Sequence, residues 1–98
     1  MKTIAFAWPL PDGKIQRLDR IIFERVGEGI SLHSHNFFHP TCVCEGKVEL
    51  YDDLGKSVIL GPGEIRGYKA GRKHGIRAVE VPAEIIHPPE PGANRHGD

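Results

Sequence analysis

Three histidines lie within seven residues of this chain, and a fourth follows far downstream: His33, His35 and His39, then His74. Imidazole is the commonest metal ligand that proteins offer at neutral pH. If the first cluster is extended, His33 and His35 project from the same face, because strand side chains repeat every second residue. On a helix the same two side chains would point apart. The spacing therefore predicts a metal site carried by a strand.

The elements expected to position these histidines are short strands. Twelve glycines and eight prolines interrupt the chain, and no segment shows helical spacing of apolar residues over three turns. Strand-like runs separated by turn residues predict an all-β antiparallel sandwich or barrel. A turn at Gly46 and Lys47 is expected to join two of the strands as a hairpin. The predicted strands are residues 4–8, 20–26, 30–35, 41–45, 48–51, 57–60, 64–68, 74–81 and 83–87.

Length and charge limit the classes of function. The 98 residues predict one domain over 1–88 followed by a flexible polar tail, 89–98. Thirteen basic residues balance thirteen acidic ones, which argues against a nucleic-acid or membrane-surface partner and suits self-association. We find neither a transmembrane run nor a convincing signal peptide, so a cytoplasmic location is expected.

The two cysteines, Cys42 and Cys44, are separated by one residue, which is poor spacing for a disulfide. The favoured interpretation is two reduced, partly buried thiols. The alternative is that they join the histidines in a soft metal site.

The segment around the histidine cluster resembles the first motif of the cupin family. That motif is a glycine, five residues, His-x-His, three or four residues, an acid, six residues and a glycine. This chain has Gly27, five residues, His33 and His35, three residues, His39, six residues and Gly46. The one departure is His39, where the family usually has glutamate and some small metal-binding members have histidine.

The second cupin motif is also matched in its spacing. The family has a glycine, five residues, Pro-x-Gly, two residues, His, three residues and Asn. This chain has Gly63, Lys69 in place of the proline, Gly71, His74, and Ala78 in place of the asparagine. The lost asparagine puts the shape of the pocket in doubt more than the binding of a metal.

The resemblance, which covers about half the chain, implies a small antiparallel β-barrel of the double-stranded β-helix (jelly-roll) type. It implies His33, His35, His39 and His74 as metal ligands, and family members are often dimers, so a homodimer is expected. Imidazole ligands suit a divalent transition metal: iron, manganese, nickel, copper or zinc. The identity of the metal is left open.

The expected function is that of a metal-dependent, iron-type oxygenase acting on a small oxygen-bearing molecule. Four neutral imidazoles leave the full charge of the metal uncompensated, and four ligands in an octahedral field leave two open positions. Two alternatives remain: a non-catalytic module that binds a small molecule or a metal, and a sugar or keto-acid isomerase. Whether the chain is an enzyme is open at this point.

Substrate contacts are predicted from strand alternation around the motifs. Arg66 and Tyr68 become candidates if they point inward, and Ile76 shares the expected inward face of the His74 strand. Phe37 and Phe38 are candidates for an apolar entrance, although aromatic residues are more often core. His87 and His96 are interpreted as ordinary histidines.

Overall fold

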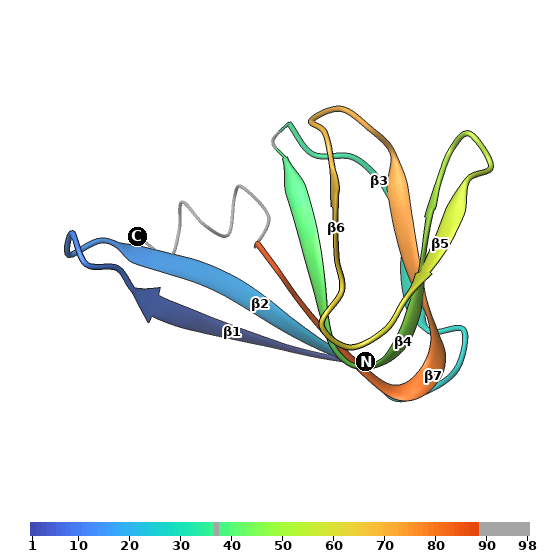
Figure 1. Ribbon diagram of the computed structural model, residues 1–98, viewed down its shortest axis with the longest axis horizontal. Coiled ribbons are helices and arrows are strands. Elements are labelled where there is room, and N and C mark those ends of the chain that lie inside the picture. The colour runs from blue at the N-terminus through green and yellow to red at the C-terminus, as the bar shows by residue number, and fades with distance from the viewer. Residues whose placement is uncertain (37, 89–98) are drawn as a thin grey trace.

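The computed structural model describes residues 1–36 and 38–88, and all the regular secondary structure in them is β-strand (Figure 1). The predicted all-β antiparallel fold is therefore confirmed. The predicted tail, 89–98, lies outside the described residues. The seven strands are β1 (Lys2–Pro9), β2 (Ile15–Phe23), β3 (Gly29–His33), β4 (His39–Asp52), β5 (Ser57–Leu60), β6 (Ile65–Tyr68) and β7 (His74–His87).

Two long strands, β4 and β7, form the centre of the fold. They pair antiparallel from Cys42 opposite Ile86 to Asp52 opposite His74. β6 and β5 pair with the first and last parts of β4, whereas β3 and β2 pair with the first and last parts of β7. Because both long strands bend midway, their flanking strands curl around a shared interior (Figure 1).

The bend replaces the hairpin that the sequence predicted at Gly46. Residues 39–52 are one strand, and its register against β7 shifts three times between Val43 and Val48. Gly46 has a φ of +69° and lies against the backbone of Glu80 and Pro82. An extra residue in one strand turns its direction without ending the pairing, so a turn-like sequence here makes a bulge. The two predicted strands at 74–81 and 83–87 are likewise one, β7.

Ten apolar side chains form the core, and most come from the two long strands. The predicted inward face of β7 is confirmed, since Ile76 and Ala78 are 5% and 2% exposed. The core consists of Ile21, Phe23, Val43, Val48, Leu50, Leu60, Ile76, Ala78, Ala83 and Ile85. Seven of the ten belong to β4 and β7, so the two long strands supply most of the core.

The β1–β2 hairpin extends away from the barrel (Figure 1). β1 is the first strand in the order β1-β2-β7-β4-β5, and β2 is its pairing partner in the described part of the chain. Seven of its eight residues are exposed. The ribbon therefore presents apolar side chains, Trp8 among them, that the barrel does not cover.

Candidate metal centre

Strand ends bring the four predicted ligands to one end of the barrel. His33 is the last residue of β3, and it lies directly opposite His74, the first residue of β7. His35 follows in the loop after β3, and His39 begins β4. The amide of Gly71 donates to the carbonyl of His35 at 2.7 Å, which ties that loop to the one preceding His74. Histidines separated by up to 41 positions thus meet in space.

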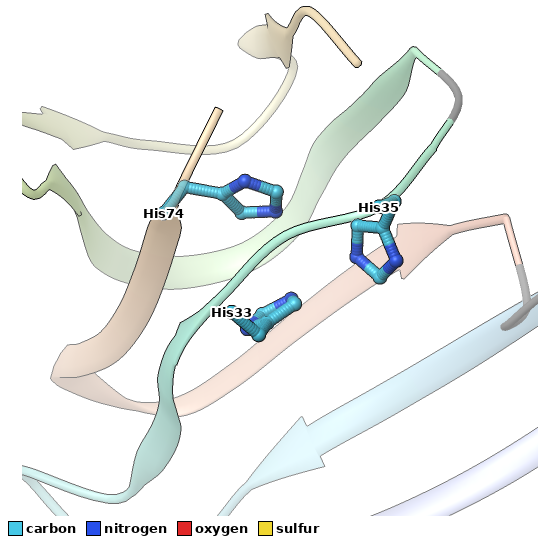
Figure 2. Close-up of side chains that lie close together, drawn as sticks. All are labelled: His33, His35 and His74. Carbon is cyan, nitrogen blue, oxygen red and sulfur yellow. The ribbon is translucent and has the colours of Figure 1, made fainter. Parts of the chain in front are cut away.

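Three of the rings form a compact group. The ligand atoms of His33, His35 and His74 all lie within 4.8 Å of one another. Figure 2 shows the three rings, from β3, its following loop and β7, gathered around a common space. His35 and His74 are buried, whereas His33 is half-buried. Among the described residues, this group contains no Asp, Glu or Cys.

Backbone carbonyls orient two of these rings. Nδ1 of His33 lies 2.7 Å from the carbonyl oxygen of Ser31, and Nδ1 of His74 lies 3.1 Å from that of Arg72. A carbonyl can only accept, so in each ring Nδ1 carries a proton, which leaves Nε2 as the nitrogen that a metal could use. Metal-binding histidines commonly donate their second ring N–H in this way. Both rings are therefore prepared to coordinate through Nε2.

His39 lies against the compact group without being part of it. Its ring stacks on His35 with a centroid distance of 4.2 Å, and it is 3% exposed. Its Nε2 is 2.9 Å from Nδ1 of His87. Burial, followed by the neighbouring imidazoles, lowers the pKa of His39 to about 3, so the ring is neutral at neutral pH. The assignment of His39 as a fourth ligand stays a prediction.

His87 is the residue of this region that sequence reasoning missed. It was interpreted as an ordinary histidine, yet it is 8% exposed and bonded to His39. The signal was strand alternation: Ile85 and Ala83, two and four residues earlier on β7, are both buried. The predicted strand 83–87 already contained this alternation, so the inward position of His87 could have been inferred from the sequence.

Comparison with known proteins gives matches to solved structures. No family model and no curated protein matches the chain. KdgF from a Halomonas species matches with a TM-score of 0.65 and 24% identity over 72% of this chain and 65% of that protein. A cupin superfamily protein from Desulfitobacterium hafniense matches with a TM-score of 0.68 and 14% identity, covering 91% of this chain and 78% of that one. The chain has the cupin fold.

A third cupin neighbour is a known metalloprotein. Bacillus subtilis oxalate decarboxylase, which has Mn(II) centres, matches with a TM-score of 0.60 and 24% identity. The match covers 72% of this chain but 20% of the decarboxylase. At these identities the likeness concerns the fold, so the chemistry must be argued from the residues of this chain itself.

The donor set of this chain fits a divalent transition metal. Neutral imidazoles suit zinc, copper, nickel and iron, and manganese is compatible with them. The ligand atoms of the three rings lie within 4.8 Å of one another, and the carbonyls at Nδ1 of His33 and His74 leave Nε2 of both rings for the ion. His33, His35 and His74 are thus the residues best placed to hold it.

Two predicted substrate residues line a charged cavity beside the cluster. Tyr68 stacks on His74 with a centroid distance of 4.6 Å and an interplanar angle of 4°. Its other neighbours include Arg66, and both line a cavity of about 290 Å³. Lys56, Lys69 and Arg72 add positive charge to the lining, and Asp52 is its one carboxylate. Burial raises the pKa of the Tyr68 phenol, so the hydroxyl keeps its proton and can donate.

The other predicted substrate contacts are Phe37, Phe38 and Ile76. Phe38 is 59% exposed and its ring covers Gly67 of β6. Ile76 belongs to the core and lines a different cavity, of about 230 Å³, with Gly29 and Tyr51. Phe37 lies outside the described residues. The apolar entrance at Phe37 and Phe38 stays a prediction.

The cysteines stand apart from the histidine cluster. Both are free thiols, Cys42 half-buried and Cys44 exposed. Neither belongs to the compact group of ligand atoms. Burial, with the nearby Cys42, raises the pKa of the Cys44 thiol, which makes it a poorer ligand at neutral pH.

Proposed function

We propose that this chain is a small metal-binding cupin in which His33, His35 and His74 hold a divalent transition metal, with His39 as the predicted fourth ligand. The main observation in support is that the ligand atoms of three imidazoles lie within 4.8 Å of one another. Backbone carbonyls set the tautomers of two of these rings, His33 and His74. Metal content after reconstitution tests the proposal. Less than about a tenth of an ion per chain, against the stoichiometric binding expected of such a site, contradicts it.

The activity we propose is that of an iron-type oxygenase acting on a small oxygen-bearing molecule. Bound there, the metal would supply Lewis acidity and a place for oxygen ligands. The ligand set carries no charge of its own, because no carboxylate joins it, so anionic oxygen donors are favoured. The rings of His35 and His74 are buried, which keeps bulk water from one side of the site.

The cavity beside Tyr68 indicates the chemical class of the substrate. Among the described residues, no ion pair is formed by Lys56, Arg66 or Lys69, whereas Arg72 pairs with Asp52 at 3.4 Å. Unpaired cations around a recess attract an anion and orient it. We therefore propose a substrate with a carboxylate or phosphate group held by Arg66 and Lys69, with the Tyr68 hydroxyl as a hydrogen-bond donor.

Two other functions use the same site. A non-catalytic metal- or small-molecule-binding module would load metal and consume no oxygen with any anionic substrate tested. A sugar or keto-acid isomerase would convert its substrate without oxygen. Oxygen uptake, followed alongside substrate loss in air and under argon, separates the three. Loss that needs oxygen supports the oxygenase, and loss under argon supports the isomerase.

We also propose that the protein is a homodimer, with β1 at the interface. On one face of the hairpin lie Ile4 and Trp8, which are 44% and 60% exposed. The charges nearby are neutralised within the chain, because Lys2 pairs with Glu24 and Arg20 with Glu84. An edge strand with a neutral, apolar face can pair with its own copy around a two-fold axis.

Small molecules are the proposed partners, and a cytoplasmic location is proposed. In the described residues, no helix is long and apolar enough to cross a membrane. The balanced charge of the chain favours small molecules over nucleic acids as ligands.

A further inference from the structure

A single loop carries the supports of two predicted metal ligands. Residues 69–73 join β6 to β7 and lead directly into His74. The carbonyl of Arg72 accepts from Nδ1 of His74 at 3.1 Å, and the amide of Gly71 donates to the carbonyl of His35 at 2.7 Å. Figure 2 shows His74 and His35 on separate segments of the backbone, with their rings close together. The position of this loop therefore affects how both rings are presented.

The side chain of Arg72 ties this loop to the central strand β4. Its Nη2 atom lies 3.4 Å from Oδ2 of Asp52, the last residue of β4. The side chain of Asp52 is 9% exposed, whereas that of Arg72 is 45% exposed. Water and salt screen a contact to such a shielded carboxylate less than they screen an ordinary surface ion pair. Asp52 thus holds the loop against the strand that runs through the centre of the fold.

Asp52 is itself held by the backbone of the turn that follows it. Its Oδ1 atom accepts from the amides of Leu54 and Lys56 at 2.8 and 2.9 Å, which leaves Oδ2 for Arg72. Asp52 also lies directly opposite His74 in the ladder between β4 and β7. The contacts form a closed chain, from the Asp52 carboxylate through the side chain and carbonyl of Arg72 to the ring of His74 and back across the ladder. The carboxylate therefore restrains the carbonyl that orients this ring.

We infer that Asp52 is a positioning residue of the proposed metal centre: through Arg72 it fixes the loop that orients His74. This inference rests on the proposed metal site and goes beyond it, because Asp52 does not belong to the compact group of ligand atoms. Without the contact to Asp52, the Arg72 side chain no longer restrains residues 69–73, and the carbonyl that accepts from His74 leaves its place more often. Nε2 of His74 is then presented to the metal for a smaller fraction of the time, and the apparent affinity falls by that fraction.

Electrostatic attraction alone predicts a different result. The Asp52 carboxylate attracts a metal cation and the Arg72 guanidinium repels one, so loss of the charge on Arg72 would tighten binding if charge alone mattered. Positioning predicts the opposite sign, because Arg72 makes the contact that holds the loop. Asp53 supplies the control for the carboxylate, since it has the same charge one residue further along the chain and is exposed.

Zinc dissociation constants, measured by competition with a chelator, test the inference. The proteins are the unmodified chain, Asp52→Asn, Arg72→Gln, the double variant and Asp53→Asn. We expect Asp52→Asn and Arg72→Gln each to weaken binding by about three- to tenfold, less than the loss of a direct partner of a ligand costs. The double variant should bind no more weakly than Asp52→Asn, because both changes remove one contact. Asp53→Asn should change the constant by less than about twofold.

The two single variants are chosen to spare the rest of the fold. Asp52→Asn keeps a side-chain oxygen for the amides of Leu54 and Lys56, so it removes the charge that faces Arg72 and retains the turn. Arg72→Gln changes a half-exposed side chain and keeps the backbone carbonyl that accepts from His74. Zinc binding by Arg72→Gln that equals or exceeds that of the unmodified chain overturns the inference, and so do additive losses in the double variant.

Proton exchange in the metal-free protein gives a second measurement. The Nδ1–H of His74 is held by the carbonyl of Arg72, and that of His33 by the carbonyl of Ser31. We expect Arg72→Gln to speed the exchange of the His74 proton with water, followed by NMR, by about threefold or more, because the loop opens more often. The His33 proton should exchange at its original rate. Equal acceleration at both rings, or none at His74, overturns the inference.

The failure of the metal site and the failure of the positioning role give different results. If no form of the chain binds zinc, the proposed metal site fails, and the inference that rests on it fails too. If the unmodified chain binds zinc and His35→Ala does not, the metal site stands. In that case, an Arg72→Gln protein with unchanged zinc affinity removes the positioning role alone.

Discussion

His33 and His74 lie directly opposite each other where β3 pairs with β7, and the Nδ1 atom of each ring faces a carbonyl two residues earlier in the chain. Strand pairing thus sets the separation of the two rings, and the local carbonyls set which nitrogen each presents. Both hydrogen-bond partners are backbone carbonyls, so the orientation of these two rings is set by the path of the backbone and does not require other side chains. This preorganisation is what a metal site requires of its protein.

Replacing a ring of the compact group should abolish metal binding. His35→Ala removes one of three converging ligands, so we expect loss of bound metal and of the metal-dependent rise in melting temperature. Elemental analysis and thermal denaturation with and without metal give the measurement. Cys44→Ser is the matched control, because that thiol is outside the group and should change neither quantity. Unchanged metal content in His35→Ala would remove this residue from the ligand set.

The part of this site that sequence could predict is the part with local spacing. His33 and His35 follow from strand alternation, and the barrel and His74 from the motif spacing. The relation of His39 to His87 could not be predicted, because it joins the start of β4 to the end of β7 and depends on how both strands bend. The bend itself was misread as a hairpin, since a glycine with positive φ serves equally in a turn and in a bulge.

The bend at Gly46 provides a stability test with an internal control. Gly46 and Gly55 both have positive φ, +69° and +81°. A Cβ at Gly46 would meet the backbone of Pro82 and Glu80, whereas one at Gly55 would meet nothing within 4 Å. We expect Gly55→Ala to lower the free energy of unfolding by about 1 kcal/mol, the cost of the left-handed backbone. Gly46→Ala should cost clearly more, as measured by urea denaturation, and equal losses would contradict the packing argument.

Asp52 should make stability depend on pH in the acid range. Its carboxylate accepts from the amides of Leu54 and Lys56 at 2.8 and 2.9 Å, and these bonds, that to Lys56 foremost, lower the pKa of Asp52. A folded-state pKa below the unfolded one gives stability that is present above the unfolded pKa, near 4, and lost as pH falls through the lower folded value. Melting temperatures measured across that range should fall less steeply in Asp52→Asn. A slope identical to that of the unmodified chain would show that the carboxylate contributes nothing.

The proposed dimer predicts that a charge on β1 will separate the subunits. Trp8→Glu places a carboxylate in the apolar face of the hairpin, where desolvation on association would be unfavourable. We expect a shift from dimer to monomer in sedimentation velocity. Ile59→Glu is the control, because Ile59 is 55% exposed on β5, away from the hairpin, and should leave the mass unchanged. A monomeric unmodified chain, or a dimer that survives Trp8→Glu, contradicts the assigned interface.

The cavity beside Tyr68 predicts that affinity for anions depends on charge and salt. Arg66→Gln and Lys69→Gln each remove one cation from its lining. Because these groups are exposed, we expect each to weaken the binding of a dicarboxylate such as oxalate to the metal-loaded protein by about two- to fivefold, and less at high salt. Lys14→Gln removes an equal charge at the distant turn between β1 and β2, so it separates the cavity from the net charge of the chain. Equal losses in all three variants would mean that the anion responds to overall charge, and an affinity unchanged in every variant would mean that the metal alone holds it.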